Sequence, residues 1–310
     1  MAFTESLQVE AAAPFNFDLT AQIFRNGDEQ IRTFQDGIFR LILKLNDHLI
    51  LAEVSSVGTT EQPKLAVQLR ANNSLTSGDK QKAEEAVRFI FNLDFDLCSF
   101  YRNINGDRVM SGIAKQLYGL KNPTTPTVFE SLVDSIIEQQ ISIKVAIALE
   151  EKLIKKFGER LDIGDETYFA FPTPQIIAVA SVEEIQRVGL SRRKAEYIHG
   201  AAELIVAGKL DLEGLKSQEN ADEIVRKLDA VRGIGVWTAE LTMLRGMQRL
   251  DMLPADDLGI RRVISTYYCG GKPINASEAR EIALRWGRWK GLAAFYLIIA
   301  EIRGIAIKEK

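Results

Sequence analysis

The sequence predicts an α+β fold, in which a small antiparallel β-containing N-terminal domain precedes a larger all-helical part. Two patterns support this. In residues 39–45 and 64–70 every second position is apolar (39, 41, 43 and 45, then 65, 67 and 69), a period of two that is typical of strands with one buried and one solvated face. Beyond about residue 80, apolar side chains recur at helical spacing instead.

The N-terminal region, residues 31–71, is expected to form strands. The runs 38–45 and 48–57 are separated by Asn46-Asp47, a pair that suits a hairpin turn. The polar stretch Ala71–Lys82 is expected to be a linker. No role is assigned to the two histidines, His48 and His199.

A long helix is expected to begin at Thr127, where Thr127-x-x-Glu130 has the pattern of a capping box. Its apolar face is predicted to run from Phe129 to Ile141. Phe171-Pro-Thr-Pro174 breaks the helices, and the next sharp interruption is 229–234. The predicted domains are residues 1–82 (antiparallel β/α), residues 83–127 together with 251–310 (helical), and residues 128–250 (helical).

Composition narrows the classes of protein. The net charge is −3, which argues against a protein that coats nucleic acid but allows a local basic face. Clusters such as Arg192-Arg193-Lys194 fit either such a face or ordinary solvated helix surfaces. With only Cys98 and Cys269, one chain cannot hold a four-cysteine metal or iron–sulfur site, and a reduced intracellular compartment is expected. We find neither a signal-peptide pattern nor an apolar run of the ~18 residues that a membrane span needs.

The segment Val231-Arg-Gly-Ile-Gly235 is a glycine hairpin between two helix-like segments. Gly233 and Gly235 allow close backbone approach, Ile234 would anchor the turn, and the free amides of the next helix would bind a phosphate. Thr238 would either bond to the phosphate or close the first helical turn. Many such turns merely connect helices, so the motif alone leaves both readings open.

Asp256 and Asp257 follow shortly after Pro254. A lone aspartate after a proline loop is usually a helix N-cap. In this chain either carboxylate would cap a helix that begins near Leu258, act on a ligand held nearby, or do both.

Together these features resemble a known family. Residues 228–260 look like the helix–hairpin–helix plus Gly/Pro-Asp (HhH-GPD) signature of the DNA glycosylase superfamily, in its 3-methyladenine DNA glycosylase II (AlkA) type. Further resemblance lies in residues 129–158, 189–195 and 286–294. It implies a two-part all-α helix-hairpin-helix DNA glycosylase core, with the wedge loop and hairpin in 128–250 and the catalytic Asp segment in 251–310.

The resemblance assigns catalysis to Asp257, which precedes the apolar Ile260 by three positions as in the family pattern, and makes Asp256 its neighbour in the substrate pocket. A carboxylate facing the sugar of a flipped nucleotide would stabilise the positive charge that develops as the base leaves. Trp237 stands where lyase members carry a lysine, so that no Schiff base is expected. Trp237 would line the base pocket, or be an ordinary core tryptophan.

Other positions depart from the family pattern or extend it. Leu241 and Ile298 stand where this branch has pocket aromatics, and Phe15, Phe17 or Phe24 could compensate if they reach the pocket rather than the core.

Gln140 matches the DNA wedge that fills the gap left by the flipped base, although an exposed helix-end glutamine is the alternative. Gly233, Ile234, Gly235 and Thr238 would bind DNA phosphate. The carbonyls of Arg232 and Ile234 would hold a monovalent cation. No catalytic metal and no cofactor are expected.

The expected function is therefore that of a monofunctional DNA glycosylase of base excision repair, which removes alkylated purines of the 3-methyladenine and 7-methylguanine type and leaves an abasic site. The alternatives are a glycosylase for an oxidised or deaminated base, and a non-catalytic helix-hairpin-helix DNA-binding protein. The partner would be double-stranded DNA with damaged bases, with no membrane and a monomeric chain. Localisation would be cytoplasmic and nucleoid-associated in a prokaryote, or nuclear in a eukaryote.

Overall fold

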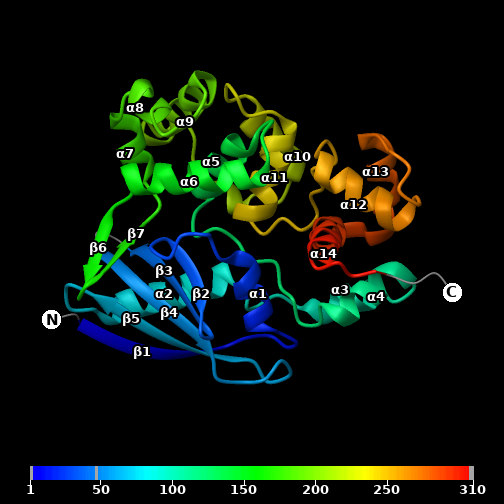
Figure 1. The fold of residues 1–310 in the computed structure, drawn as a ribbon, viewed down its shortest axis with the longest axis horizontal. Coiled ribbons are helices and arrows are strands. Elements are labelled where there is room, and N and C mark those ends of the chain that lie inside the picture. Colours follow the sequence, from blue (N-terminus) through cyan, green and yellow to red (C-terminus); the bar gives the residue numbers. More distant parts are fainter. Residues whose placement is uncertain (1–2, 46–47, 307–310) are drawn as a thin grey trace.

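The structure is a computed structural model that describes residues 3–45 and 48–306. Figure 1 shows a β-sheet at the N-terminal end of the molecule, with the helices above it and to one side. The sheet is antiparallel with the strand order β1-β5-β4-β3-β2. Its strands are β1 (Phe3–Glu10), β2 (Arg32–Gln35), β3 (Ile38–Leu45), β4 (His48–Ser56) and β5 (Lys64–Ala71). The predicted strands are confirmed, while the predicted turn Asn46-Asp47 lies outside the described residues.

One face of the sheet packs against α1 (Phe17–Phe24) and α2 (Ser77–Ile90). The expectation of a linker at 71–82 was wrong in its second half, because α2 already begins at Ser77. Thr76 caps it, and Asp79 completes a capping box. The first turn of α2 is polar, so the sequence shows no apolar helical pattern there.

The other face of the sheet, expected to be solvated, is partly covered. A β-hairpin of β6 (Arg160–Ile163) and β7 (Glu166–Phe169) lies inside the helical part and packs on Ile42 and Leu51. The prediction of an all-helical second part missed this hairpin, whose strands are too short to show a period. It buries apolar side chains of the sheet that would otherwise face water.

The helical part forms two bundles. The first consists of α5 (Val128–Glu138), α6 (Ile143–Phe157), α7 (Pro174–Val179), α8 (Val182–Gln186), α9 (Arg192–Val206), the 3₁₀ turn η1 (Gly214–Ser217), α10 (Ala221–Asp229) and α11 (Val236–Gly246). The second consists of α3 (Leu97–Asn103), α4 (Arg108–Gln116), α12 (Leu258–Tyr268), α13 (Ala276–Ala283), η2 (Leu284–Trp289) and α14 (Lys290–Ile302). No helix among the described residues is long and apolar enough to cross a membrane.

The predicted helix from Thr127 is confirmed at its start, where the Thr127 side chain caps α5, but it ends earlier than expected. Helix α5 stops at Glu138, and Ile141 is exposed rather than on the buried face. The backbone leaves the helical conformation at Gln139, which has a ψ of 122°, and Gln140 follows with a left-handed φ of 57°. A residue in that conformation cannot continue a right-handed helix.

Apolar side chains gather into three large clusters. One joins the sheet to α1 and α2, one fills the α5–α11 bundle, and one fills the bundle of α3, α4 and α12–α14. Helix α2 packs with the sheet, beyond the predicted limit at residue 82. The domain limits at 82, 127 and 250 stay predictions, because shared cores do not by themselves define independent folding units.

Candidate functional site

The glycine hairpin lies between α10 and α11, and its two glycines are fixed differently. Gly233 has a φ of 91°, and a Cβ there would lie 2.1 Å from Cγ of the Tyr197 ring. Backbone conformation and space therefore both require glycine at this position. Gly235 has an extended φ of −89°, and no described atom lies within 4 Å of an added Cβ. Ile234 is only 2% exposed and packs in the core of the first bundle, as expected for the anchor of the turn.

Helix α11 begins with uncapped amide groups. Its N-cap residue, Gly235, has no side chain to accept from the first N–H groups. Both Gly235 and Val236 are exposed, so this helix end is open to a ligand. Exposed amides at the positive end of a helix dipole bind phosphate groups. This geometry fits the phosphate role predicted for the hairpin.

Thr238 lies on the inner side of the hairpin. It is 2% exposed, and its Oγ1 accepts a hydrogen bond of 3.0 Å from Nε2 of Gln139. This placement disfavours bonding to a phosphate, because the buried hydroxyl joins α11 to Gln139 at the end of α5.

The hairpin carbonyls alternate between bonded and free. Those of Val231, Gly233 and Gly235 accept hydrogen bonds. Within the described ranges, no hydrogen bond ends on the carbonyl oxygen of Arg232 or Ile234. Free carbonyl oxygens are ligands that a monovalent cation takes. This donor set fits the cation that the family resemblance implies, and such an ion would add positive charge beside a bound phosphate.

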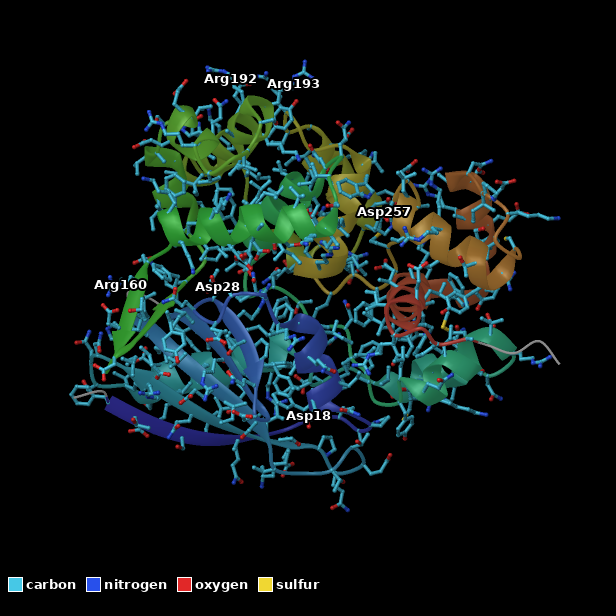
Figure 2. The ribbon with its side chains drawn as sticks, in the orientation of Figure 1. Asp18, Asp28, Arg160, Arg192, Arg193 and Asp257 are labelled. Atoms are coloured by element: carbon cyan, nitrogen blue, oxygen red, sulfur yellow. The ribbon has the colours of Figure 1, made fainter. Side chains whose placement is uncertain are left out.

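Asp257 and Trp237 are brought together from the two bundles. Nε1 of Trp237, in the first turn of α11, donates a hydrogen bond of 3.1 Å to Oδ2 of Asp257. Asp257 is also the N-cap of α12, since its Oδ1 accepts from the backbone N–H of Ile260 at 2.9 Å. Figure 2 places Asp257 where the helices α10 and α11 meet the α12–α14 bundle. Both oxygens of this carboxylate are thus oriented by the protein, and Asp257 and Trp237 are both only partly buried.

Asp256 points to a different partner. Its Oδ2 accepts from Nη2 of Arg280 on α13 at 2.9 Å, and the same nitrogen lies 3.6 Å from Oε2 of Glu240. Glu240 is buried on α11, three residues after Trp237. Burial raises the pKa of Glu240 to about 7, opposed by Arg280 and reinforced by Asp256. The arginine therefore links the loop of the predicted catalytic aspartate to α11.

The predicted pocket positions beyond Trp237 are apolar. Leu241 is 4% exposed on α11, and Ile298 on α14 is partly buried. The N-terminal aromatics do not compensate. Phe15, Phe17 and Phe24 pack within the sheet core, where Phe17 and Phe91 lie 5.2 Å apart and Phe24 and Phe39 lie 5.7 Å apart.

Gln140 follows the end of α5, and its backbone conformation presents it as an exposed side chain. The preceding residue, Gln139, bonds to the hairpin, so the predicted wedge lies directly beside the predicted phosphate grip. Sequence reasoning missed Gln139, Lys194 and Glu240. Nothing in the sequence distinguishes their side chains from those of exposed neighbours, because their partners come from distant segments.

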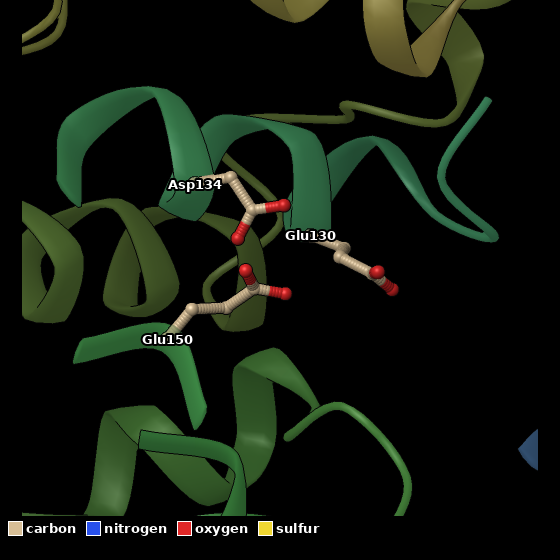
Figure 3. Close-up of side chains that lie close together, drawn as sticks. All are labelled: Glu130, Asp134 and Glu150. Carbon is tan, nitrogen blue, oxygen red and sulfur yellow. The ribbon is translucent and has the colours of Figure 1, made fainter. Parts of the chain in front are cut away.

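A separate group of carboxylates comes from two helices of the first bundle, and Figure 3 shows Glu130 and Asp134 of α5 close to Glu150 of α6. One oxygen from each of Glu130, Asp134 and Glu150 lies within 4.8 Å of the others, close enough to hold a metal ion. Arg32 of β2 enters this group, with Nη1 2.9 Å from Glu130 and Nη2 3.8 Å from Glu150. Burial raises the pKa of all three acids, that of Glu130 to about 7. Arg32 thus offsets part of the negative charge, and its ion pairs join the sheet to α5 and α6.

Comparisons with known proteins agree with this architecture. A DNA-3-methyladenine glycosylase of Bacillus subtilis is 28% identical over 92% of this chain and 94% of its own length. DNA-3-methyladenine glycosylase 2 of Escherichia coli is 29% identical over 74% of this chain and 76% of its own. The solved 3-methyladenine DNA-glycosylase of Archaeoglobus fulgidus superposes with a TM-score of 0.86 at 28% identity, over 97% of this chain and 100% of that one.

The sequence model described as "HhH-GPD superfamily base excision DNA repair protein" matches residues 133–288, about half of the chain. The matched range contains the wedge loop, the hairpin, Trp237 and Asp257. The chain therefore belongs to the HhH-GPD superfamily of base excision DNA repair proteins.

Proposed function

We propose that this protein is a monofunctional DNA glycosylase that flips an alkylated purine out of double-stranded DNA and hydrolyses its N-glycosidic bond, leaving an abasic site. The observation that carries the proposal is the hydrogen bond between Trp237 and Asp257 beside the open end of α11. This bond holds the carboxylate at the N-cap of α12 against an aromatic side chain in the first turn of α11, the turn that also carries the proposed phosphate grip. The names and coverage of the relatives support alkylated purines as the substrate class.

Each part has a physical task. The amides at Gly235 and Val236 would hold a backbone phosphate next to the damaged nucleotide. The indole of Trp237 would stack on the flipped base, with cation–π attraction if the base is alkylated and cationic. The carboxylate of Asp257 would stabilise the sugar as positive charge develops, and would orient the attacking water. Gln140 would fill the gap in the duplex.

The lyase reaction requires an amine that attacks the sugar. In this chain the position next to the hairpin is Trp237, whose indole nitrogen is not nucleophilic and is already bonded to Asp257. We therefore expect water to be the nucleophile. Treatment of an enzyme–abasic DNA mixture with borohydride should trap no covalent adduct, whereas a trapped adduct would contradict the monofunctional assignment.

The substrate is tested with duplexes that each contain a single 7-methylguanine, hypoxanthine, uracil or 8-oxoguanine. We expect release of free 7-methylguanine. The apolar residues Leu241 and Ile298, in place of pocket aromatics, favour one alternative, a glycosylase for a deaminated or oxidised base. Release of only those bases would support it, and binding without any release would support a non-catalytic DNA-binding protein. The chain is expected to act as a monomer in the compartment that holds the DNA.

A further inference from the structure

The loop that carries Gln140 is held by a lysine from another helix. Nζ of Lys194, in the first turn of α9, donates to the carbonyl oxygen of Ile137 at 2.8 Å and to that of Gln139 at 2.6 Å. These are carbonyls at the C-terminal end of α5, which have no partner within the helix. An ammonium group at this negative end of the helix dipole is well placed to satisfy them.

Lys194 differs from the arginines beside it. Figure 2 shows Arg192 and Arg193 at the outer edge of the molecule, and both are exposed, whereas Lys194 is partly buried. Burial lowers the pKa of the Lys194 ammonium. The basic cluster that fits a solvated helix face is therefore divided, with one member turned inward to the wedge loop.

Gln139 connects the same loop to the hairpin. Its Nε2 donates to the carbonyl oxygen of Gly233 and to Oγ1 of Thr238, both at 3.0 Å. One glutamine thus has its backbone carbonyl held by α9 and its side chain held by the hairpin and α11.

Gln140 itself has no such support. It is exposed, its backbone has a φ of 57°, and no side-chain hydrogen bond joins it to any described residue. A non-glycine residue in this region carries strain that its surroundings must sustain. The direction in which Gln140 points is therefore set by the residues that hold Gln139.

We propose that Lys194 and Gln139 form a bracket that fixes Gln140 relative to the phosphate-binding hairpin, and that Lys194 is thereby a positioning residue for base flipping. This inference rests on the proposed wedge role of Gln140. The bracket makes wedge and grip one rigid unit, so that holding the phosphate also aims the wedge at the base step. Without the bracket, Gln140 and the hairpin would both be present but misaligned. Such misalignment should lower the rate of base flipping more than the affinity for DNA.

The test compares Lys194→Met, which keeps the length of the side chain but donates no hydrogen bond, with Lys194→Arg, which can still donate to both carbonyls. Arg193→Met is the matched control, because Arg193 is exposed on the same turn and makes no ion pair or hydrogen bond with the described residues. Flipping is followed by stopped-flow fluorescence of 2-aminopurine next to a 7-methylguanine, and affinity by titration with abasic DNA.

We expect Lys194→Met to slow flipping by about 10- to 100-fold, with a change in affinity no larger than that of Arg193→Met. Lys194→Arg should recover most of the rate. A Lys194→Met rate equal to that of Arg193→Met would overturn the bracket, as would a loss that Lys194→Arg does not repair in a variant with an unchanged melting temperature.

The double variant Gln140→Ala/Lys194→Met separates the bracket from the wedge. If Lys194 acts through Gln140, the double variant flips no more slowly than Gln140→Ala alone. Additive losses would show that Lys194 acts by another route and would refute the bracket. If the Gln140→Ala variant flips the base at the parent rate, Gln140 is not the wedge, and the inference about Lys194 is refuted as well.

Discussion

Replacing Asp257 with asparagine should remove catalysis while leaving the fold intact. Asparagine caps helices about as well as aspartate, so its amide oxygen can still accept from the N–H of Ile260, while its NH2 group then faces Nε1 of Trp237 and cannot accept that bond. The larger loss is that of the negative charge. A unit charge about 4 Å from a developing sugar cation, at an effective dielectric constant of about 20, is worth about 4 kcal/mol. That corresponds to roughly a 1,000-fold loss of rate.

The assay is single-turnover release of 7-methylguanine, together with the melting temperature and the affinity for abasic DNA. Two further variants separate charge from position. Asp257→Glu keeps the charge but displaces it, and should lose less than Asp257→Asn. Asp257→Ala loses the helix cap as well, which should cost about 1 kcal/mol of stability in addition to the rate. If Asp257→Asn stays within tenfold of the parent rate, Asp257 is not the group that stabilises the transition state.

Three other predictions concern the glycines of the hairpin, the pH dependence of stability and the bond between Trp237 and Asp257. Gly233→Ala should destabilise the protein by more than 1 kcal/mol, because of its φ of 91° and its contact with Tyr197, whereas Gly235→Ala should cost less; urea unfolding of the two variants checks this. Since burial raises the pKa of Glu130 above its ordinary 4.5 to about 7, its contribution to the free energy of unfolding is full below pH 4.5 and is lost as pH rises through 7. Glu130→Gln should therefore remove up to roughly 3 kcal/mol of pH dependence, seen as a smaller difference between urea unfolding at pH 5 and pH 8. Trp237→Phe keeps a ring but removes the bond to Asp257, and base release should slow about 10-fold at unchanged melting temperature; an unchanged rate would show that this bond does not orient the carboxylate.

The parts of the fold that the sequence predicted are those with long, regular patterns. The apolar pattern of 39–45 falls within one strand, β3, and the predicted cap Thr127 marks the start of α5, although the Glu130 side chain bonds to Arg32 and does not complete the predicted capping box. The parts that it missed are short or locally ambiguous. Strands β6 and β7 have four residues each, fewer than a period-two pattern needs to stand out.

The same division holds for the candidate site. The hairpin and Asp257 lie in one continuous stretch, so their spacing is visible in the sequence, and the structure adds that Trp237 bonds to Asp257 directly. The contacts of Lys194 are with residues more than fifty positions away, and no local pattern records them. The sequence could not show whether the N-terminal phenylalanines line the pocket. In the structure they pack in the core between the five-stranded sheet and α2, where large apolar side chains fill the space.

The open end of α11 bears on how an acidic chain can hold a polyanion. The proposed phosphate grip consists of peptide N–H groups, supplemented by free carbonyls that suit a bound cation. Peptide dipoles carry no titratable proton and offer no amine for acetylation. Such contacts are therefore constant across pH and beyond the reach of charge-removing modification, and the chain can keep the net negative charge of −3 that favours solubility without giving up its hold on DNA.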